Sequence, residues 1–405
     1  MKVLLVHKFH RLTGGAEVFY FEVARILKEN GHEVAFFSTG DPDNIISSDA
    51  LYTVPPPGYD ANNIFSKITS AKDIFYSGRN RKVMEKALNE FKPDIVHVFA
   101  IHVHLSPSIL EAVKARDIPV VMSCNDYKHI CPNYKLYDGK ALCEACKGGA
   151  FYQAVLKKCC QNSYSYSIAS AIEAYVHQYK NVYRRLIDLY LFSSHFMLDK
   201  TQEFWQGRGI KTGLLRNPFD VGAYEPKYSG DYALYFGRLV NEKGVQLLLD
   251  AANHVEMPIK IIGDGPDLKY VSAQLQENRL GNVELLGPLW GDELTRVLYD
   301  AAFVVVPSLW HENFPYVILQ SFAAGKPVIG SMRGGIPEML GDNGERGLLF
   351  EPDDVTDLPK KMRALWDDSR LVYRMGQSAR LYVEREFSDA RFYQSIMDNY
   401  GRVLT

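Results

Sequence analysis

Residues 232–253 read YALYFGRLVNEKGVQLLLDAAN, and this stretch decides the fold. Its first five residues are all apolar or aromatic, which is typical of a strand that is buried on both faces of a parallel sheet. A loop bounded by Gly237 and Gly244 follows, and the residues from Val245 to Asn253 have the apolar spacing of a helix. In open α/β sheets, ligands bind beyond the carboxyl ends of the strands, so this loop is expected to border a binding site.

The amino-terminal half of the chain opens in the same way. Val3 to Val6 form a short apolar run, a loop with Gly14-Gly15 follows, and residues 16–30 have helical spacing. Further apolar strands alternate with helices in both halves, at residues 33–38, 95–99, 120–123, 259–262, 283–286 and 303–306. This alternation predicts an α/β protein with parallel sheets that are covered by helices on both faces.

The repeated opening predicts two Rossmann-like domains with a boundary near Asn217. We expect residues 1–218 to form the first domain and residues 219–384 the second. The helical stretch from Ala390 to Val403 is long enough to return to the first domain, which residues 385–405 would complete. Two such sheets that face each other would enclose one deep cleft.

The composition narrows the class of protein. The chain has 405 residues, more than one domain usually holds, and 47% of them are hydrophobic, as in soluble globular proteins. The 46 Lys and Arg nearly balance the 48 Asp and Glu without a long run of one sign, which argues against nucleic acid as a partner. The first apolar run is too short for a secretion signal, and no run approaches the roughly 18 residues of a membrane span. We therefore expect a cytoplasmic protein, with contact to the inner face of the membrane as an alternative.

The loop after residues 232–236 carries two cations. Arg238 and Lys243 can converge on an anion at the carboxyl end of the strand, and phosphate is the natural candidate. An isolated pair of loop cations is more often a solvated surface feature. The segment after the strand at 303–306 favours the phosphate interpretation.

That segment runs from His311 to Ile329 and begins with HENFPYVILQ. Pro315 suits the first turn of a helix, and Gly325 suits its end. The free backbone N–H groups at residues 314–316 would then form an anion site. Glu312 could accept hydrogen bonds from sugar hydroxyls, and Gln320 could bond a ribose diol. The alternative is a surface glutamate and a glutamine at the edge of the core.

Several motifs together resemble those of the family 4 retaining glycosyltransferases, the glycosyl transferases group 1, over nearly the whole chain. They are Gly237-Arg238 to Lys243-Gly244, Ile262-Gly263-Asp264-Gly265-Pro266, Pro307-Ser308 to Glu312-Asn313-Phe314-Pro315, Gly325-Lys326-Pro327-Val328-Ile329, Gly334-Gly335-Ile336-Pro337-Glu338 and Gly14-Gly15-Ala16-Glu17. The resemblance implies the GT-B architecture and retention of the anomeric configuration. It also implies a nucleotide-diphosphate sugar donor, held mainly by the second domain, and an acceptor, held mainly by the first.

The resemblance assigns roles to individual residues. Arg238 and Lys243 would neutralise the diphosphate and, with Glu312 near the donor sugar, would form the catalytic group. Two cations and a helix terminus could stabilise the leaving diphosphate without a metal cofactor. The expected donor-binding residues are Gly14, Gly15, Gly237, Asn313, Phe314, Pro315, Tyr316 and Gln320. The expected acceptor-binding residues are Asn125, Asp126 and Tyr127.

Two positions depart from the family pattern. Gln320 stands where the family usually has a glutamate, although an amide can still bond a ribose hydroxyl. Asn125 stands where a histidine often precedes Asp-Tyr, so an imidazole role would pass to Asn125 or His129, or be absent.

We expect a retaining, hexosyltransferase-type enzyme that moves a sugar to a glycan or lipid-linked saccharide acceptor in polysaccharide or glycolipid biosynthesis. A nucleotide-sugar epimerase of the same fold and a catalytically silent sugar-nucleotide binder are the alternatives.

All six cysteines lie between Cys124 and Cys160. A structural zinc site could use Cys131, Cys143 and Cys146 together with Cys159 or Cys160, and free thiols or a disulfide are the alternatives. Residues 164–185 mix aromatic and basic side chains, so they form either a peripheral membrane contact or a solvated helix that packs on the first domain. Asp41 and Asp43 resemble a metal-binding pair, but they lie in a polar loop.

Overall fold

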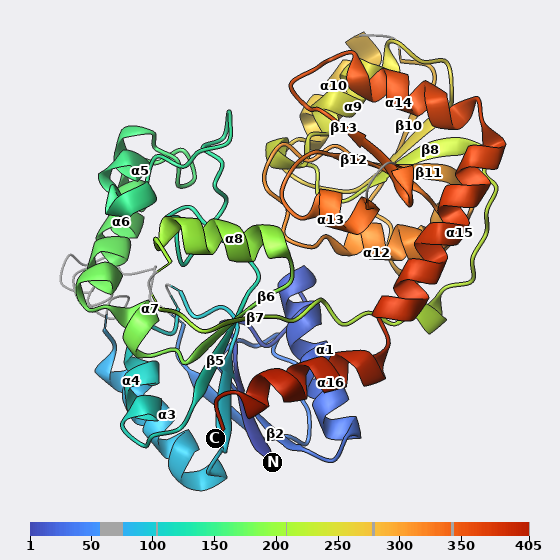
Figure 1. Ribbon diagram of the computed structural model, residues 1–405. Coiled ribbons are helices and arrows are strands. Elements are labelled where there is room, and N and C mark those ends of the chain that lie inside the picture. Colours follow the sequence, from blue (N-terminus) through green and yellow to red (C-terminus); the bar gives the residue numbers. More distant parts are fainter. Residues whose placement is uncertain (57–75, 103, 208, 278–279, 342–343, 405) are drawn as a thin grey trace. The chain divides into compact units, whose positions relative to one another are not determined.

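The computed structural model describes residues 1–56, 76–102, 104–207, 209–277, 280–341 and 344–404 (Figure 1). The chain forms two compact units. The first comprises Met1–Asp138, Glu144–Pro218 and Asp389–Thr405, and the second comprises Gly139–Cys143 and Phe219–Ser388. Each unit is built on its own parallel sheet, so the predicted α/β class with two Rossmann-like domains is confirmed.

The first unit holds a seven-stranded sheet in the order β3-β2-β1-β4-β5-β6-β7. Its strands are β1 (Lys2–Val6), β2 (Glu33–Thr39), β3 (Leu51–Val54), β4 (Ile95–Val98), β5 (Val120–Cys124), β6 (Leu189–Phe192) and β7 (Thr212–Leu214). Strand β1 pairs in parallel with β2 on one side and β4 on the other. Its residues from Val3 to Val6 are completely buried, as a continuous apolar strand between two helical layers requires.

Helices cover both faces of this sheet. They are α1 (Gly15–Glu29), α3 (Gly78–Phe91), α4 (Ser108–Lys114), α5 (Tyr152–Leu156), α6 (Tyr164–Tyr179), α7 (Val182–Arg185), α8 (His195–Phe204) and α16 (Asp389–Gly401). One core gathers residues of α3 and α4 on one face, and a second core gathers residues of α1 and α16 with the sheet. Ser77 and Ser194 cap α3 and α8 by accepting a hydrogen bond from a backbone N–H of the first turn.

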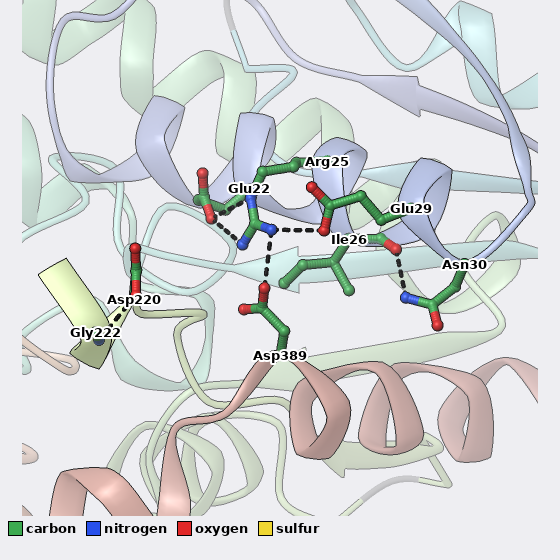
Figure 2. A network of polar contacts seen from close by, with 8 residues as sticks. All are labelled: Glu22, Arg25, Ile26, Glu29, Asn30, Asp220, Gly222 and Asp389. Carbon is green, nitrogen blue, oxygen red and sulfur yellow. Dashed lines mark hydrogen bonds and ion pairs between the residues drawn. The ribbon is translucent and has the colours of Figure 1, made fainter.

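The return of the C-terminal helix to the first unit is confirmed, and Figure 1 shows α16 beside α1. Phe392, Ile396 and Tyr400 bury one face of α16 in the core that α1 also lines. Asp389 at the start of α16 accepts a hydrogen bond from Arg25 of α1 at 2.8 Å, as Figure 2 shows. The same guanidinium also contacts Glu22 and Glu29, so several acidic groups share one cation.

The second unit holds a six-stranded sheet in the order β10-β9-β8-β11-β12-β13. Its strands are β8 (Tyr232–Phe236), β9 (Ile259–Ile262), β10 (Val283–Gly287), β11 (Ala301–Val306), β12 (Val328–Ser331) and β13 (Gly347–Phe350). Its helices are α9 (Val245–Ala252), α10 (Leu268–Glu277), α11 (Gly291–Tyr299), α12 (Tyr316–Ala323), α13 (Ile336–Leu340), α14 (Asp357–Trp366) and α15 (Ser369–Glu386). This unit extends to Ser388, beyond residue 384, because α15 continues to Glu386 and Phe387 is buried in its core.

Both sheets have a topological switch point. In the first sheet the chain order reverses between β1 and β4, and in the second it reverses between β8 and β11. Loops that leave neighbouring strands in opposite directions open a crevice at such a point. Among the described residues, no helix has both the length and the apolar character that crossing a bilayer requires.

Candidate active site

The switch point of the second sheet brings together two predicted catalytic side chains. Lys243 lies in the short 3₁₀ turn Asn241–Lys243 after β8, and Glu312 lies in the loop after β11. The Lys243 Nζ is 2.7 Å from the Glu312 Oε1. Ser308, from the same loop as Glu312, donates a hydrogen bond to that oxygen at 2.6 Å. Two loops from adjacent strands thus meet through a charged pair.

Glu312 is ionised in this setting although its side chain is buried. Burial alone would raise the pKa of this carboxyl, but the charge of Lys243 and the hydrogen bonds from Lys243 and Ser308 outweigh that effect and hold the pKa below its usual value. The Lys243 side chain is 26% exposed, so its ammonium reaches the protein surface from the buried carboxylate. The pair is neutral overall, and it fixes the position of the Lys243 ammonium at the carboxyl ends of β8 and β11.

Two glycines allow these loops to pack closely. A Cβ atom on Gly244, whose φ is +71°, would lie 1.9 Å from the Pro307 carbonyl oxygen. A Cβ atom on Gly334 would lie 2.1 Å from the Glu312 carbonyl oxygen, which accepts a hydrogen bond from the Gly335 N–H at 2.8 Å. Only glycine leaves room for these backbone contacts. The glycines of two family motifs therefore hold the Lys243 and Glu312 loops in place.

The Ile262-Gly263-Asp264-Gly265-Pro266 motif supports the Arg238 loop in the same way. Cβ atoms on Gly263 and Gly265 would lie 1.9 Å and 2.3 Å from the carbonyl oxygens of Gly237 and Leu239. Arg238 itself is exposed, and its carbonyl accepts a hydrogen bond from the Tyr235 hydroxyl at 2.9 Å. Within the described part of the chain, no acidic side chain pairs with the Arg238 guanidinium, which leaves this cation available to a ligand.

The helix α12 starts one residue later than the sequence suggested. Pro315 is the cap residue and has an extended backbone, so it precedes the first turn instead of occupying it. The Phe314 ring is 3% exposed and packs against Phe387, so its side chain belongs to the core. The Phe314 side chain is therefore not available to a ligand, and a ligand contact at this residue would use its backbone. Gln320 donates a hydrogen bond to the Tyr224 hydroxyl at 3.2 Å.

The predicted residues of the first unit lie in two different loops. Gly14 caps α1 with an extended backbone, and a Cβ atom there would make only an ordinary contact at 3.6 Å with Glu17. Packing within the chain therefore does not require glycine at this position. Asn125 and Asp126 follow β5 and are partly exposed, and burial raises the pKa of Asp126.

Two interpretations of the segment after β5 need correction. The Tyr127 side chain is 1% exposed within the first core, so it supports the loop and is not positioned to contact an acceptor. His129 is also buried, and its Nε2 lies 2.8 Å from the Thr201 hydroxyl. This histidine is occupied inside the fold and cannot replace the imidazole that the family often has before Asp-Tyr.

Sequence reasoning missed a set of buried histidines near the switch point of the first sheet. His7 follows β1, and His97 lies within β4, where it bonds the Tyr400 hydroxyl at 2.7 Å and the Ser123 hydroxyl at 2.8 Å. Burial lowers the pKa of both rings to about 3, so they are neutral. The contact of 3.7 Å between His7 and Glu17 is consequently not an ion pair. A histidine inside an apolar strand, as in Ile95–Val98, is the pattern that could have revealed this group.

The thiols of the first unit influence one another. A hydrogen bond from Cys159 lowers the pKa of the Cys160 thiol to about 6, with further contributions from Lys128 and Ser167 against the effect of burial. Cys159 is in turn affected by the charges of Cys160, Cys131 and Cys146. Among the described residues, however, no three cysteine sulfurs lie within 4.8 Å of one another. The remaining predicted ligand, Cys143, belongs to the segment Gly139–Cys143 that groups with the second unit.

The carboxylates of Asp41 and Asp43 are not a metal site. Each lies 3.0 Å from the same Arg11 guanidinium, so the two carboxylates already share one cation.

Two units, each with a parallel sheet and a switch point between its central strands, define an α/β protein with two Rossmann-like domains. Residues 13–220, slightly more than half of the chain, match Glycosyltransferase Family 4, and residues 223–382 match Glycosyl transferases group 1. The chain therefore belongs to glycosyltransferase family 4.

Individual relatives are consistent with this assignment. The chain is 34% identical to an uncharacterized glycosyltransferase of Methanocaldococcus jannaschii over 38% of its own length and 44% of that protein. It is 29% identical to glycogen synthase of Mycobacterium tuberculosis over 54% of its length and 55% of that protein. The chain thus spans about half the length of these relatives. The solved structure of Anabaena HepE in complex with UDP matches 99% of this chain and 100% of that one, with a TM-score of 0.69 and 18% identity, which supports the GT-B fold.

Proposed function

We propose that this protein is a retaining glycosyltransferase that moves a sugar from a nucleotide-diphosphate sugar to a glycan or lipid-linked saccharide in polysaccharide or glycolipid biosynthesis. The observation that carries the proposal is the Lys243–Glu312 pair at the switch point of the second sheet, beside the exposed Arg238. A diphosphate is the ligand that two cations and a helix amino terminus at one sheet edge bind best.

In this proposal, transfer depends on stabilising the leaving nucleoside diphosphate. Arg238 and Lys243 take up the negative charge that develops on the diphosphate as the bond to the sugar breaks. The first N–H groups of α12 add partial positive charge at the same edge. These groups are already in place before the reaction, so they stabilise the transition state without a catalytic metal. Glu312 accepts hydrogen bonds from the sugar, and Gln320 bonds the ribose.

The first unit would bind the acceptor through Asn125 and Asp126. Gly14 and Gly15 would let the backbone approach the donor phosphates and the acceptor closely. The support for this role is that Gly14 has no packing reason to be glycine, unlike Gly244 and Gly334. The remaining physical reason for a glycine at position 14 is a ligand that occupies the space where a side chain would lie.

The first test is a donor screen with UDP-, GDP- and ADP-sugars in the presence of a chelator. We would begin with UDP-glucose, since HepE, a structural neighbour, has been crystallised with it. Release of the nucleoside diphosphate that depends on a saccharide acceptor, with a product of unchanged anomeric configuration by NMR, is the expected outcome. Conversion of the free donor without an acceptor would establish the epimerase instead. Donor binding without hydrolysis or transfer would establish a silent binder.

We also propose that residues 164–185, which form α6 and α7, contact an anionic membrane surface. Tyr164, Ile168, Ile172, Tyr175 and Tyr179 recur at helical spacing along α6, and all are exposed, from 39% at Tyr175 to 92% at Tyr179. The opposite face buries polar groups, so the apolar stripe points to solvent. Residues 145–185 contain six Lys and Arg side chains, of which Lys147, Lys157 and Arg185 pair with acidic residues outside this range. The one acidic residue within the range, Glu173, is buried. An aromatic stripe with basic flanks fits the headgroup region of anionic lipid.

Vesicle sedimentation tests this contact. The protein should bind vesicles with phosphatidylglycerol, bind phosphatidylcholine vesicles weakly, and lose binding on Ile168→Ser with Ile172→Ser. The matched control is Val355→Ser, at a residue that is 73% exposed on the second unit. Equal binding of the wild type and the double variant would show that this stripe does not face lipid.

We propose that a structural zinc ion is held by Cys131, Cys143, Cys146 and Cys159, with Cys160 as an alternative to Cys159. The Cys-x-x-Cys spacing of Cys143 and Cys146 supports the proposal. Elemental analysis of unchelated protein should give about one zinc per chain from this site, and less than about 0.2 would remove it.

A further inference from the structure

A second group of potential metal ligands lies in the first unit, separate from the Lys243–Glu312 pair and containing no cysteine. His102 follows β4, and Glu173 and His177 both project from α6. One donor atom from each side chain lies within 4.8 Å of the others. Glu173 and His177 are four residues apart, so they share one face of the helix. This face is the buried one, opposite the exposed apolar stripe.

One nitrogen in this group has no described partner. His177 is 4% exposed, and its Nε2 makes no hydrogen bond in the described part of the chain. Buried polar atoms in native proteins are almost always hydrogen-bonded, so an atom without a partner indicates a missing ligand. A cation bound at this nitrogen would satisfy it.

Tyr183 orients both imidazoles. Its hydroxyl lies 3.3 Å from the His177 Nδ1 and 3.1 Å from the His102 Nδ1. Histidine ligands of metals are usually fixed in this way, with one ring nitrogen hydrogen-bonded to a neighbouring group and the other facing the ion. The tyrosine therefore occupies the place of the outer partner in a metal site.

A cavity of about 290 Å³ gives access to the group. It is lined by Glu173, His177 and Tyr183, among other residues of the first unit. A cavity of this size holds several waters, so an ion could enter and keep a water ligand. Three protein ligands and one water are the arrangement of open zinc sites.

We propose that His102, Glu173 and His177 bind a divalent transition-metal cation of the Zn²⁺ class. The site does not rest on the glycosyltransferase activity proposed above and uses no cysteine as a ligand, although Cys131 and Cys146 line the same cavity. Lys128 opposes the cation, because its ammonium is 2.8 Å from the Glu173 Oε2 in the same buried region. The alternative is that Lys128 and Glu173 form only a structural ion pair, with the histidines as neutral neighbours. The two accounts give opposite results when Lys128 is replaced.

The test is a titration of chelator-treated full-length protein with Co²⁺, which reports tetrahedral coordination by its visible absorption. The wild type should show a tetrahedral band without a thiolate charge-transfer band from this site, in addition to any cobalt bound by the cysteines. His177→Gln should weaken this binding by more than about 100-fold, whereas Lys128→Met should strengthen it. The control is His129→Gln, which changes another histidine of the same cavity and should leave the band unchanged.

Two outcomes would overturn the proposal. One is a wild-type spectrum that shows only thiolate-bound cobalt. The other is a His177→Gln protein with the same stoichiometry and band as the wild type. If His177→Gln does not fold, His102→Gln serves instead, because His102 lies in a loop and is less buried. The same loss is expected for that variant, and unchanged binding would equally reject the site.

Discussion

The two sheets of this protein share the strand order around their switch points but carry different chemistry there. At β8 and β11 the crevice holds the Lys243–Glu312 ion pair and the exposed Arg238. At β1 and β4 the corresponding region holds His7 and His97, which are buried and neutral. The second edge is therefore built around an ion pair, whereas the first is built around buried, neutral histidines.

The difference teaches that the topology supplies a place for a ligand but not its identity. In the second sheet, Gly244 and Gly334 lack a side chain, so the backbones of the loops that carry Lys243 and Glu312 can pack directly against neighbouring carbonyl groups. In the first sheet, the histidines stack on aromatic rings, as His97 does on Phe99 at 4.3 Å. Charge removed from the second edge should reduce turnover, and polar groups removed from the first edge should reduce stability.

The largest effect is expected for Lys243→Ala. Loss of one preorganised cation should lower the rate of transfer roughly 100- to 1,000-fold. Initial rates of nucleoside diphosphate release would measure the loss, with Lys243→Arg as the charge-preserving control and thermal melting as a check of folding. A Lys243→Ala enzyme that is folded and within tenfold of the wild type would break the comparison, because the charged edge would then not serve the reaction.

Substitutions at Gly244 and Gly14 should distinguish a glycine that packing requires from one that a ligand requires. Gly244→Ala places a Cβ atom 1.9 Å from the Pro307 carbonyl oxygen at a φ of +71°, so it should lower the free energy of unfolding by about 2–4 kcal/mol. Gly14→Ala meets only an ordinary contact and should change stability by less than about 1 kcal/mol. Urea unfolding measures both, and transfer rates show whether Gly14→Ala still impairs the reaction. Equal destabilisation by the two variants would contradict this division.

Lys326 lies at the opposite end of the second sheet from Lys243 and allows a buried lysine to be compared with one in an ion pair. Its side chain is fully buried, donates to the Ser229 carbonyl at 3.0 Å, and has a pKa that burial lowers to about 7. Between pH 7 and the unfolded value near 10.5, the unfolded state binds the additional proton, so the free energy of unfolding should rise with pH.

Relative to Lys326→Met, the wild type should gain roughly 2–3 kcal/mol from pH 7 to pH 9.5. The Lys326→Met protein should be the more stable of the two near pH 7. Denaturant titrations of both proteins at each pH measure the difference, in which other titrating groups cancel. A difference that does not change with pH would show that the pKa of Lys326 is the same in the folded and unfolded states.

The smallest effect is expected at the first switch point. Tyr400→Phe removes the hydroxyl that lies 2.7 Å from the His97 Nδ1 and leaves a buried nitrogen without this partner. The free energy of unfolding should fall by about 1–2 kcal/mol, while the transfer rate at 25 °C should stay within about twofold. If Tyr400→Phe lost most of its transfer rate at unchanged stability, His97 would take part in the reaction. The two sheet edges would then not differ in the way described above.

Much of the fold could be predicted from periodicity. Continuous apolar runs such as residues 301–306 and helices with regular apolar spacing define the α/β alternation, and the repeated glycine loop indicates two domains. The strands β3, β6, β7, β12 and β13 were not predicted, because a run of three or four residues often cannot be told from a helix segment or a loop by its periodicity. Pro315 was placed inside α12, since proline is compatible with both the cap and the first turn.

The candidate site was only partly accessible from the sequence. Family motifs identify Arg238, Lys243 and Glu312 as candidate site residues. These motifs do not show whether the side chain of Glu312 is buried or exposed. The burial of Phe314 and Tyr127 was missed, because a residue in a loop motif can face the core as readily as a ligand. The group of His102, Glu173 and His177 was missed because His102 is far from the others in the sequence.

The amino-acid sequence by itself determined the two α/β units, the glycines in their loops and the residue types that handle phosphate. It could do so because strand, helix and turn preferences act over a few neighbouring residues. Only the tertiary structure decided that Lys243 pairs with Glu312, that His7 and His97 are neutral, and that three ligands meet at α6. Burial and the distance between residues far apart in the chain set these properties, and both exist only once the chain has packed.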